Sequence, residues 1–532
     1  MYKLNGVKLP IAAMKEHMKL LYNGKTYNIS RGTLLSELFK RENMDIPMVC
    51  AGMGRCGKCK VRFVSGAPRA TSADSSFFSE DEIKSGWRLA CRAVITEDAE
   101  IETDLSAAKE DKAFSIKEES REDKCEDLSS GNFVAAIDIG TTTIAAAIIS
   151  PKDGNDIIKK AVTMNHQRSY GADVISRIKA ANEGNADVLR KLVTDDLKGL
   201  LKNVALKEVV IAGNTTMLHL LVGDSCEGLG ISPYKPVRLS YPEMSFSEVL
   251  GVTFEEKDIY DETECRIMPG ISAFVGADIV SGMYALDFYK IPEGKTYMLI
   301  DLGTNGEMAV ADSKKITVCS TAAGPVFEGG GISCGMAGVS GAIEHVKIDK
   351  EKKTADYRTI ENTEPLGICG SGVLELVSEL RRCDIVDETG LLADEYFEEG
   401  FILYKDEKKT ISFPQNDIRA LQLAKAAIRS GIDTLLSEHG ITSADVDKVY
   451  IAGGFSEHLD IDMIKALKML PEGFINKNIT ECVGNTSLKG CIKALGDCDY
   501  QKKITDIAAR SSEISLAGTD TFGESFISAM NL

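Results

Sequence analysis

The sequence lacks the features that mark nucleic-acid-binding and membrane proteins. Its 62 lysines and arginines are outnumbered by 80 aspartates and glutamates, which gives a formal net charge of −18. Such a charge repels phosphate backbones and anionic lipids, so we expect neither nucleic acid nor a membrane as a partner. The longest apolar run, Phe133 to Ile149, is interrupted by Asp138 and three threonines. The sequence therefore predicts no membrane-spanning segment.

A secretory signal is also missing. Residues 1–20 carry scattered lysines but no apolar core followed by a small-residue cleavage site, so we expect a cytoplasmic protein. Disulfides are not expected there, and the 14 cysteines need another explanation. The six histidines are scattered without metal-binding spacing, and no P-loop of the form G-x-x-x-x-G-K-[ST] is present.

The length of 532 residues predicts several domains. Residues 18–30 are typical of a hairpin around Asn23-Gly24, residues 31–42 of a helix, and residues 60–66 and 88–95 of strands, which together define a first domain over 18–105. Residues 106–131 are mostly charged or small, which predicts a flexible linker.

Four cysteines in the first domain have the spacing of iron–sulfur ligands. Cys50, Cys56 and Cys59 stand in C-x5-C-x2-C order, and Cys91 follows in a later strand. Three thiolates on one loop plus a distant fourth is the arrangement of [2Fe–2S] ferredoxins, and the interspersed glycines let the backbone curl around a cluster. A zinc site is the alternative, although zinc favours two short knuckles.

From residue 132 onward strands and helices alternate, and one pattern occurs twice. Residues 297–310 repeat the strand-turn-strand pattern of residues 133–149, and residues 448–455 repeat the buried strand of residues 208–214. This repetition predicts an internally duplicated α/β unit, which we divide into residues 132–207 and 208–532.

Each copy contains a turn suited to phosphate. Asp138 and Asp301 each end an apolar strand, where a carboxylate can hold Mg²⁺ directly or through water. The turns that follow offer backbone N–H and hydroxyl donors to phosphate oxygens. These turn residues are Gly140, Thr141, Thr142, Thr143, Gly303, Thr304, Asn305 and Gly306. Alternatively, the aspartates are ordinary turn residues at strand ends.

Three further groups near these turns have two interpretations each. Glu307 can orient a water or a hydrated metal ion, or it is a plain strand residue. Gly213, Asn214 and Thr215 can reach a terminal phosphate, or Asn214 caps the following helix.

The paired loops resemble those of the actin, sugar-kinase and heat-shock-chaperone ATPase superfamily, and the resemblance covers residues 133 to about 485. It implies a duplicated ribonuclease-H-like fold that binds ATP with Mg²⁺. The two aspartate loops would then grip the β- and γ-phosphates. Gly453 and Gly454 would pack against adenosine, with Phe455 beside them in the same stretch, YIAGGFSEHLD.

Taken as a whole, the chain resembles the ATP-dependent reductive activators of corrinoid proteins from anaerobes. The supporting stretches are GADVISRI, IDLGTNGE, AAGPVFEGGGISCGM, GICGSG and AGGFSEHLD. The resemblance implies a β-grasp ferredoxin domain joined by a linker to the duplicated ATPase. It also implies one-electron reduction of cob(II)alamin to cob(I)alamin on a partner corrinoid protein of a methyltransferase system. A reduced ferredoxin or flavodoxin would be the electron donor, and a homodimer is left open.

Two other functions remain open from the sequence: ATP-gated electron donation to a radical dehydratase, and a non-catalytic redox-sensing ATP-binding module. Ser333, in the glycine-rich loop, either faces cobalt on the docked partner or caps a helix. The later cysteines lack ligand spacing and are predicted to be buried thiols: Cys334, Cys369, Cys482, Cys491 and Cys498.

Overall fold

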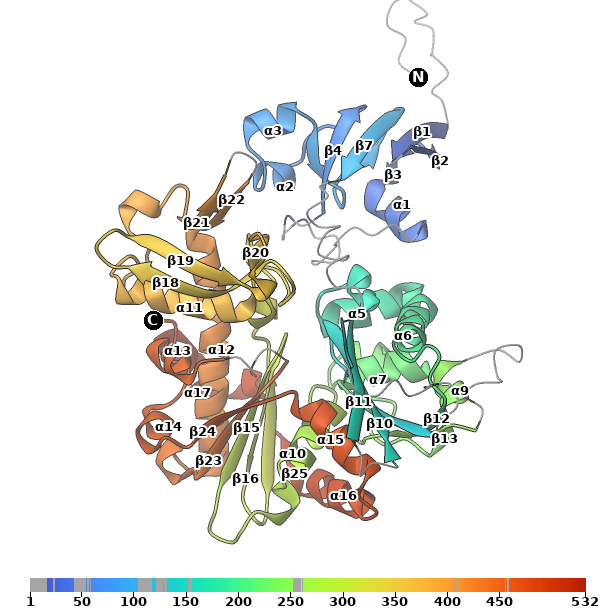
Figure 1. Ribbon diagram of the computed structural model, residues 1–532, viewed down its shortest axis with the longest axis vertical. Helices are drawn as coiled ribbons and strands as arrows, with labels where there is room; N and C mark the ends of the chain where they lie inside the picture. The colour runs from blue at the N-terminus through green and yellow to red at the C-terminus, as the bar shows by residue number, and fades with distance from the viewer. Residues whose placement is uncertain are drawn as a thin grey trace, which may run out of the picture. The chain divides into compact units, whose positions relative to one another are not determined.

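The computed structural model describes residues 17–22, 24–42, 54, 57, 59–103, 117–120, 128, 132–151, 156–251, 260, 262–406, 409–454, 456 and 459–532. The chain forms two compact units, Met1–Lys109 and Glu110–Leu532 (Figure 1). The predictions for Cys50, Cys56 and Phe455 fall outside the described residues. In the described part of the chain, no helix has both the length and the apolar character needed to cross a membrane.

The first unit is a mixed sheet with a helix packed on it. Its strands lie in the order β2-β1-β7-β4-β5, with β1 parallel to β7 and the β1–β2 hairpin turning at Gly24. Helix α1 buries Leu35, Leu38 and Phe39 in the core of this unit. This is the predicted β-grasp arrangement. The elements are β1 (His17–Tyr22), β2 (Lys25–Ser30), β3 (Thr33–Leu34), α1 (Leu35–Arg41), β4 (Lys60–Ser65), α2 (Ser72–Ser75), α3 (Glu80–Lys84), β5 (Trp87–Leu89), β6 (Val94–Ile95) and β7 (Ala99–Thr103).

One strand prediction for this unit was wrong. Residues 88–95 do not form a continuous strand, because the backbone N–H groups of Arg92 and Ala93 both donate to the carbonyl of Leu89 and close a turn. That turn separates β5 from β6 and holds Cys91.

The second unit begins with a seven-stranded sheet in the order β13-β14-β12-β9-β10-β11-β8. Strands β9 and β10 form the predicted hairpin, and β12 lies parallel to β9. The strands are β8 (Lys117–Ser120), β9 (Phe133–Ile139), β10 (Thr143–Ser150), β11 (Asp156–Met164), β12 (Leu206–Gly213), β13 (Met244–Ser245) and β14 (Glu264–Ile267).

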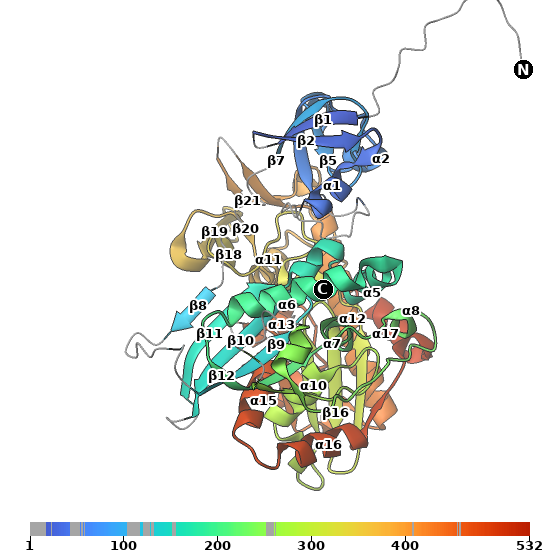
Figure 2. The same ribbon diagram turned by 90° about the vertical axis from the view of Figure 1, so that its right-hand side faces the viewer.

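Two sequence-based boundaries differ from this sheet. Strand β8 lies within the predicted linker 106–131, yet it pairs with β11 at the sheet edge (Figure 2). The division between residues 207 and 208 falls inside β12, whose hydrogen bonds to β9 continue across it. The first subdomain therefore extends past this point, because β12 completes the sheet that β9 begins.

Helices cover this sheet, and their ends follow local capping. Helix α5 starts at Val174, because the Asp173 carboxylate accepts from the backbone N–H of Ser176. The helical segments here are η2 (His166–Tyr170), α5 (Val174–Ala180), η3 (Ala181–Asn185), α6 (Ala186–Leu200), α7 (Thr215–Val222), α8 (Glu227–Gly230) and α9 (Phe246–Leu250).

A second sheet repeats the design of the first, in the order β24-β23-β15-β16-β17-β25. Strand β15 forms a hairpin with β16 and lies parallel to β23, as β9 does with β10 and β12. In register, Asp138 pairs with Ala212 and Asp301 with Ala452. The predicted duplication is thus confirmed strand by strand. These strands are β15 (Tyr297–Leu302), β16 (Gly306–Ala311), β17 (Ile316–Thr321), β23 (Lys448–Ala452), β24 (Thr480–Gly484) and β25 (Ser511–Glu513).

Two helices, α10 and α15, pack against each other (Figure 1); α10 contacts strands of both sheets, and α15 contacts β9, β10 and β12 of the first sheet. The long helix α12 covers β16 and β17. The helical elements in this half are α10 (Ala277–Ala285), η5 (Phe288–Lys290), η6 (Pro325–Glu328), η7 (Ile360–Asn362), α11 (Gly370–Arg382), η8 (Asp394–Tyr396), α12 (Gln415–His439), η9 (Ser443–Asp445), α13 (Ile461–Ala466), α14 (Glu472–Lys477), α15 (Thr486–Leu495), α16 (Tyr500–Arg510), η11 (Leu516–Gly518) and α17 (Asp520–Ser528). Smaller sheets contain β18 (Ala342–Asp349), β19 (Thr354–Thr359), β20 (Gly367–Ile368), β21 (Phe401–Lys405) and β22 (Thr410–Phe413).

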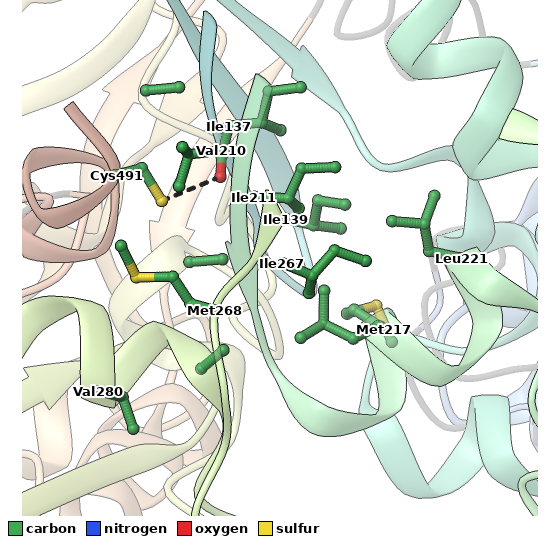
Figure 3. Close-up of a cluster of buried hydrophobic side chains, with 14 of the residues drawn as sticks. Ile137, Ile139, Val210, Ile211, Met217, Leu221, Ile267, Met268, Val280 and Cys491 are labelled. Atoms are coloured by element: carbon green, nitrogen blue, oxygen red, sulfur yellow. Dashed lines mark hydrogen bonds between the residues drawn. The ribbon is translucent and has the colours of Figure 1, made fainter. Parts of the chain in front are cut away.

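Hydrophobic side chains around β9 pack helices against the first sheet. Ile137, Ile139 and Ile211 lie between Met217 on one side and Cys491 on the other (Figure 3). The Cys491 thiol donates to the carbonyl of Ile137 at 3.5 Å. Cys491 and Cys369 are buried as predicted, but Cys498 is exposed and Cys334 and Cys482 are half-buried, so that prediction was wrong for three cysteines.

Candidate functional site

Two of the predicted cluster ligands lie side by side in the first unit. Cys59 precedes β4 and Cys91 lies in the turn after β5, and the backbone N–H of Ala90 donates to the carbonyl of Cys59 at 2.8 Å. Both cysteines are buried. This backbone hydrogen bond brings together the two segments that carry Cys59 and Cys91, which are distant in the sequence.

The glycines of the cysteine loop are required by its geometry. Gly54 and Gly57 have φ values of +70° and +66°. A Cβ atom at Gly54 would lie 2.6 Å from the Arg92 side chain, and one at Gly57 would lie 2.5 Å from the ring of Phe77. This tight, left-handed backbone fits a loop that curls around a cluster. The described part of the loop thus fits [2Fe–2S] ligation by Cys50, Cys56, Cys59 and Cys91.

In the second unit the two predicted phosphate loops face each other. Each closes as a tight turn, with Gly140 N–H donating to the carbonyl of Thr143 and Gly303 N–H donating to that of Asn305, both at 3.0 Å. The hydroxyls of Thr142 and Thr304 approach to 3.3 Å. Loops 162 residues apart in the chain thus meet at one point.

Two side chains from outside the first phosphate loop bind its backbone carbonyl groups. The fully buried Arg177 donates from Nη2 to the carbonyl of Thr141 at 2.5 Å, and Asn165 donates from Nδ2 to the carbonyl of Gly140 at 2.9 Å. Burial lowers the pKa of Arg177 to about 9. These contacts orient the loop before any ligand binds, which reduces the entropy cost of binding.

Five acidic side chains gather around the loops: Asp138, Asp278, Asp301, Glu307 and Glu328. Asp138 accepts hydrogen bonds from Asn485 and Ser487, both at 2.7 Å, at the start of α15. Asp278 lies in the first turn of α10. Asp301 and Glu307 face each other across the β15–β16 hairpin.

The crowding of these carboxylates is electrostatically unfavourable. Burial and the neighbouring Asp138 raise the pKa of Asp278 to about 7. Burial, Asp278 and Asp138 raise the pKa of Asp301 to about 8, and the pKa of Glu307 also lies well above its usual value because of burial and Asp278. Among the described residues, no lysine or arginine forms an ion pair with any of the five carboxylates. Among the described residues no three carboxylates are placed to ligate one metal ion directly, so this set of hard oxygen donors fits a Mg²⁺ ion that keeps its water ligands.

The glycine of each I-A-G strand packs on the neighbouring phosphate loop. A Cβ atom at Gly213 would lie 2.8 Å from the carbonyl oxygen of Ile139, and one at Gly453 would lie 2.2 Å from that of Leu302. Gly453 also has a φ of +115°. Next to it, Gly454 has open space where a Cβ would point. The second glycine pair thus leaves room for a flat ligand group.

Other predicted residues have local structural partners. Asn214 caps α7 by accepting from the N–H of Thr216 at 2.9 Å, which is the alternative interpretation of that residue. The Thr215 hydroxyl donates to the carbonyl of Ser272. Ser333 is exposed and does not cap a helix. Its hydroxyl donates to the Asp417 carboxylate at 2.9 Å, and its backbone N–H donates to the same carboxylate at 3.0 Å.

Three residues of the site were missed by the sequence reasoning: Arg177, Asp278 and Glu328. Arg177 and Glu328 lie within GADVISRI and AAGPVFEGGGISCGM, which served only to establish the resemblance. Asp278 lies two residues after Gly276 at the start of a helix, a weak signal that becomes informative only once α10 is placed beside β12 and β15.

Comparisons with known proteins agree with the division of the chain into two compact units. Residues 21–96 match the "2Fe-2S iron-sulfur cluster binding domain" family, residues 133–291 the "RACo middle region", and residues 295–532 the "C-terminal domain of RACo the ASKHA domain". The two RACo families together match more than half of the chain. The chain belongs to the RACo family.

Individual relatives are named for corrinoid activation. The chain is 32% identical over 368 residues to the corrinoid activation enzyme RamQ of Eubacterium limosum, covering 63% of this chain and 60% of RamQ. It is 24% identical to the [Co(II) methylated amine-specific corrinoid protein] reductase of Methanosarcina barkeri, covering 74% and 75% of the two chains. The match thus spans less than two thirds of RamQ but three quarters of the reductase.

A solved structure, titled "Reductive activator for corrinoid,iron-sulfur protein", is similar over nearly the whole chain. The TM-score is 0.69 with 28% identity, and the similarity covers 97% of this chain and 98% of the other. The predicted combination of a ferredoxin domain with an actin-like ATPase fold is therefore confirmed, and with it the [2Fe–2S] cluster and ATP as cofactors.

We expect Cys91→Ser to lose most of the iron and the visible absorbance, because Cys91 is buried beside Cys59 and one of the four thiolates is removed. The measurement is iron and sulfide content, about two of each per wild-type chain. Cys498→Ser, at an exposed cysteine of the second unit, should keep the full content. A wild-type preparation that contains zinc instead of iron would contradict the assignment.

The carboxylate cluster predicts a pH-dependent stability of the Mg²⁺-free, nucleotide-free protein. The raised pKa values of Asp278 and Asp301 mean that the folded state binds more protons than the unfolded state from about pH 4 to about pH 8, so stability falls as pH rises through this window. Asp301→Asn removes one titrating group and should flatten the fall, raising the Tm by about 2 °C or more at pH 8. Thermal unfolding between pH 6 and 8.5 tests this.

Asp384→Asn is the matched control, because Asp384 is exposed and pairs with Lys350 far from the loops. Its Tm should follow the wild-type pH dependence. An Asp301→Asn protein with an unchanged slope would show that Asp301 is not destabilised by its neighbours.

Proposed function

We propose that this protein reduces cob(II)alamin on a partner corrinoid protein of a methyltransferase system to cob(I)alamin by one electron, in a step that depends on ATP. The observation that carries the proposal is the convergence of two phosphate loops and a carboxylate cluster in a chain that also has a ferredoxin unit. The names of the relatives support the corrinoid substrate.

We assign the nucleotide to the point where the two loops meet. The hydroxyls and backbone N–H groups of residues 140–143 and 303–306 would bind the β- and γ-phosphates of ATP. Asp138, Asp301 and Glu307 would hold the hydrated Mg²⁺, whose charge relieves the repulsion among them. Gly454 has open space where the adenosine is expected. Gly213, Asn214 and Thr215 would support the first loop rather than contact phosphate.

The ferredoxin unit would supply the electron. Cys50, Cys56, Cys59 and Cys91 would hold the [2Fe–2S] cluster, which stores and releases one electron at a time. Reaching cob(I)alamin is uphill even for a low-potential cluster, and each ~59 mV of gap costs a factor of ten in equilibrium. A difference in affinity for the corrinoid partner between the ATP-bound and ADP-bound states of this protein supplies free energy that can offset this unfavourable equilibrium.

The exposed tip of the glycine-rich loop is the surface we propose for the corrinoid partner. Ser333 lies at this tip, with its hydroxyl oriented by Asp417 on α12. Glycines on both sides keep the loop narrow, so that it can approach another surface closely. We further propose a reduced ferredoxin or flavodoxin as electron donor and the cytoplasm as the compartment. A homodimer stays a prediction from the sequence.

Asp301→Asn should abolish ATP-dependent cobalt reduction and leave the visible absorbance of the cluster unchanged, because the two sites lie in separate compact units. The measurement is the cob(II)alamin absorbance of the purified partner, with and without ATP. Glu375→Gln, a glutamate on α11 that binds His345 and Val346, is the matched control and should reduce at the wild-type rate. Wild-type activity in Asp301→Asn would place the nucleotide elsewhere.

A chain lacking residues 1–105 should bind the corrinoid protein and hydrolyse ATP but fail to reduce cobalt. All four cluster cysteines lie in the deleted part, whereas both phosphate loops and the Ser333 loop lie in the second unit. Calorimetry with the corrinoid partner measures binding. If the truncated chain does not bind although its ATPase is intact, the ferredoxin unit carries the recognition instead.

A further inference from the structure

One carboxylate joins the two phosphate loops. Oε2 of Glu328 accepts a hydrogen bond from the Thr142 hydroxyl at 2.7 Å and another from the Thr304 hydroxyl at 2.6 Å. The two threonines belong to hairpins of different sheets. Glu328 ends η6, so a third segment of the chain contributes the group that bridges them.

The Glu328 carboxylate binds the same two hydroxyl groups that we assign to phosphate oxygens of ATP. The two hydroxyl donors are the type of group that phosphate loops offer to phosphate oxygens. The charges that act on Glu328 include Arg177, which attracts it, and Asp301, which is repelled by it. A phosphate group that binds these hydroxyls must therefore displace Glu328, because one hydroxyl proton cannot serve two anions and the two anions repel.

Displacing Glu328 would disturb the loop that carries Ser333. Gly329 follows directly, with a φ of +78°, and a Cβ atom there would lie 2.1 Å from the carbonyl oxygen of Met336. A Cβ at Gly335 would likewise lie 2.0 Å from the carbonyl oxygen of Gly329. The base of the loop is thus packed backbone against backbone.

The loop is also held by β20 and by the core, because the Cys334 carbonyl accepts from the N–H of Ile368 at 2.9 Å and Ile332 is buried. Met336 N–H donates to the carbonyl of Ile368 at 2.9 Å, and the tip is held through Ser333 by Asp417. A shift at Gly329 cannot be absorbed at the close-packed base without moving residues 335 and 336. A backbone shift at Glu328 and Gly329 would therefore be passed on to residues 335 and 336 at the other end of the loop.

We propose that Glu328 senses the γ-phosphate: ATP releases it from Thr142 and Thr304 and so shifts residues 329–336, whereas ADP leaves it in place. This inference rests on the proposed function, since it assumes that ATP binds between the loops. Glu328 acts as a positioning residue rather than a catalytic one. In this proposal the Thr142 and Thr304 hydroxyls bind the γ-phosphate, which ADP lacks, and the remaining donors of the loops bind the β-phosphate, so ATP favours the released state.

The first test compares the Kd of Mg-ATP and Mg-ADP for the full-length wild type, Glu328→Gln and Glu375→Gln by calorimetry. Glutamine keeps an oxygen acceptor for the hydroxyls but removes the charge that opposes phosphate. We expect Glu328→Gln to bind ATP about tenfold more tightly and to change ADP binding by less than about threefold. The control Glu375→Gln should match the wild type for both nucleotides.

Equal tightening for ATP and ADP, or no change, would overturn the proposal, because the carboxylate would then not compete with the third phosphate. A wild-type protein that binds neither nucleotide would instead overturn the proposed function. The two failures are thereby distinguishable.

Hydrogen exchange of the amides of residues 329–336 supplies the second readout. In the wild type we expect faster exchange with ATP than with ADP. In Glu328→Ala the bridge is absent, so exchange should be fast and equal with ATP, with ADP and without nucleotide. Slow exchange of the β9 amides would show that the variant is folded. A wild-type difference between ATP and ADP that persists in Glu328→Ala would rule out Glu328 as the sensor.

Discussion

The repulsion among carboxylates between the two sheets is the constraint on which the second unit depends. Asp138 ends β9, Asp301 ends β15 and Asp278 starts α10, and no described lysine or arginine pairs with them. Their raised pKa values express the cost of this arrangement. Because no lysine or arginine of the described structure pairs with these three carboxylates, the cluster is suited to bind a cation from solution. The ends of β9 and β15 and the start of α10 hold the carboxylates in this unfavourable arrangement.

Duplication is the means by which the fold brings these acids together. Each half has an aspartate on a central strand, flanked by a hairpin partner and by a parallel strand that ends in Ala-Gly. Helix α10 contacts strands of both sheets and packs against α15, which binds Asp138 through Asn485 and Ser487. A change at the phosphate loops would therefore reach the packed helices and the glycine-rich loop, as the proposed coupling of nucleotide state to a docking surface requires.

Much of this architecture could be predicted from the sequence because its signals are local. The Asn23-Gly24 turn, the C-x5-C-x2-C spacing and the two strand-turn-strand segments each lie within a short stretch. The errors arose where a distant partner decides the outcome. Strand β8 lies in a charged stretch and pairs only because β11 offers an edge, and Cys498 is exposed because no element packs over it in the described structure.

The sequence by itself determined the family and predicted the cluster ligands and the two aspartate loops, since these depend on residue type and spacing along the chain. Only the tertiary structure decided which side chains meet. Asp278 joins Asp138 and Asp301 because α10 packs against both sheets, and Glu328 bridges Thr142 and Thr304 across 186 and 24 residues of sequence. Asn214 likewise turned out to cap a helix. Such contacts depend on strand register and packing between elements, and no local periodicity encodes them.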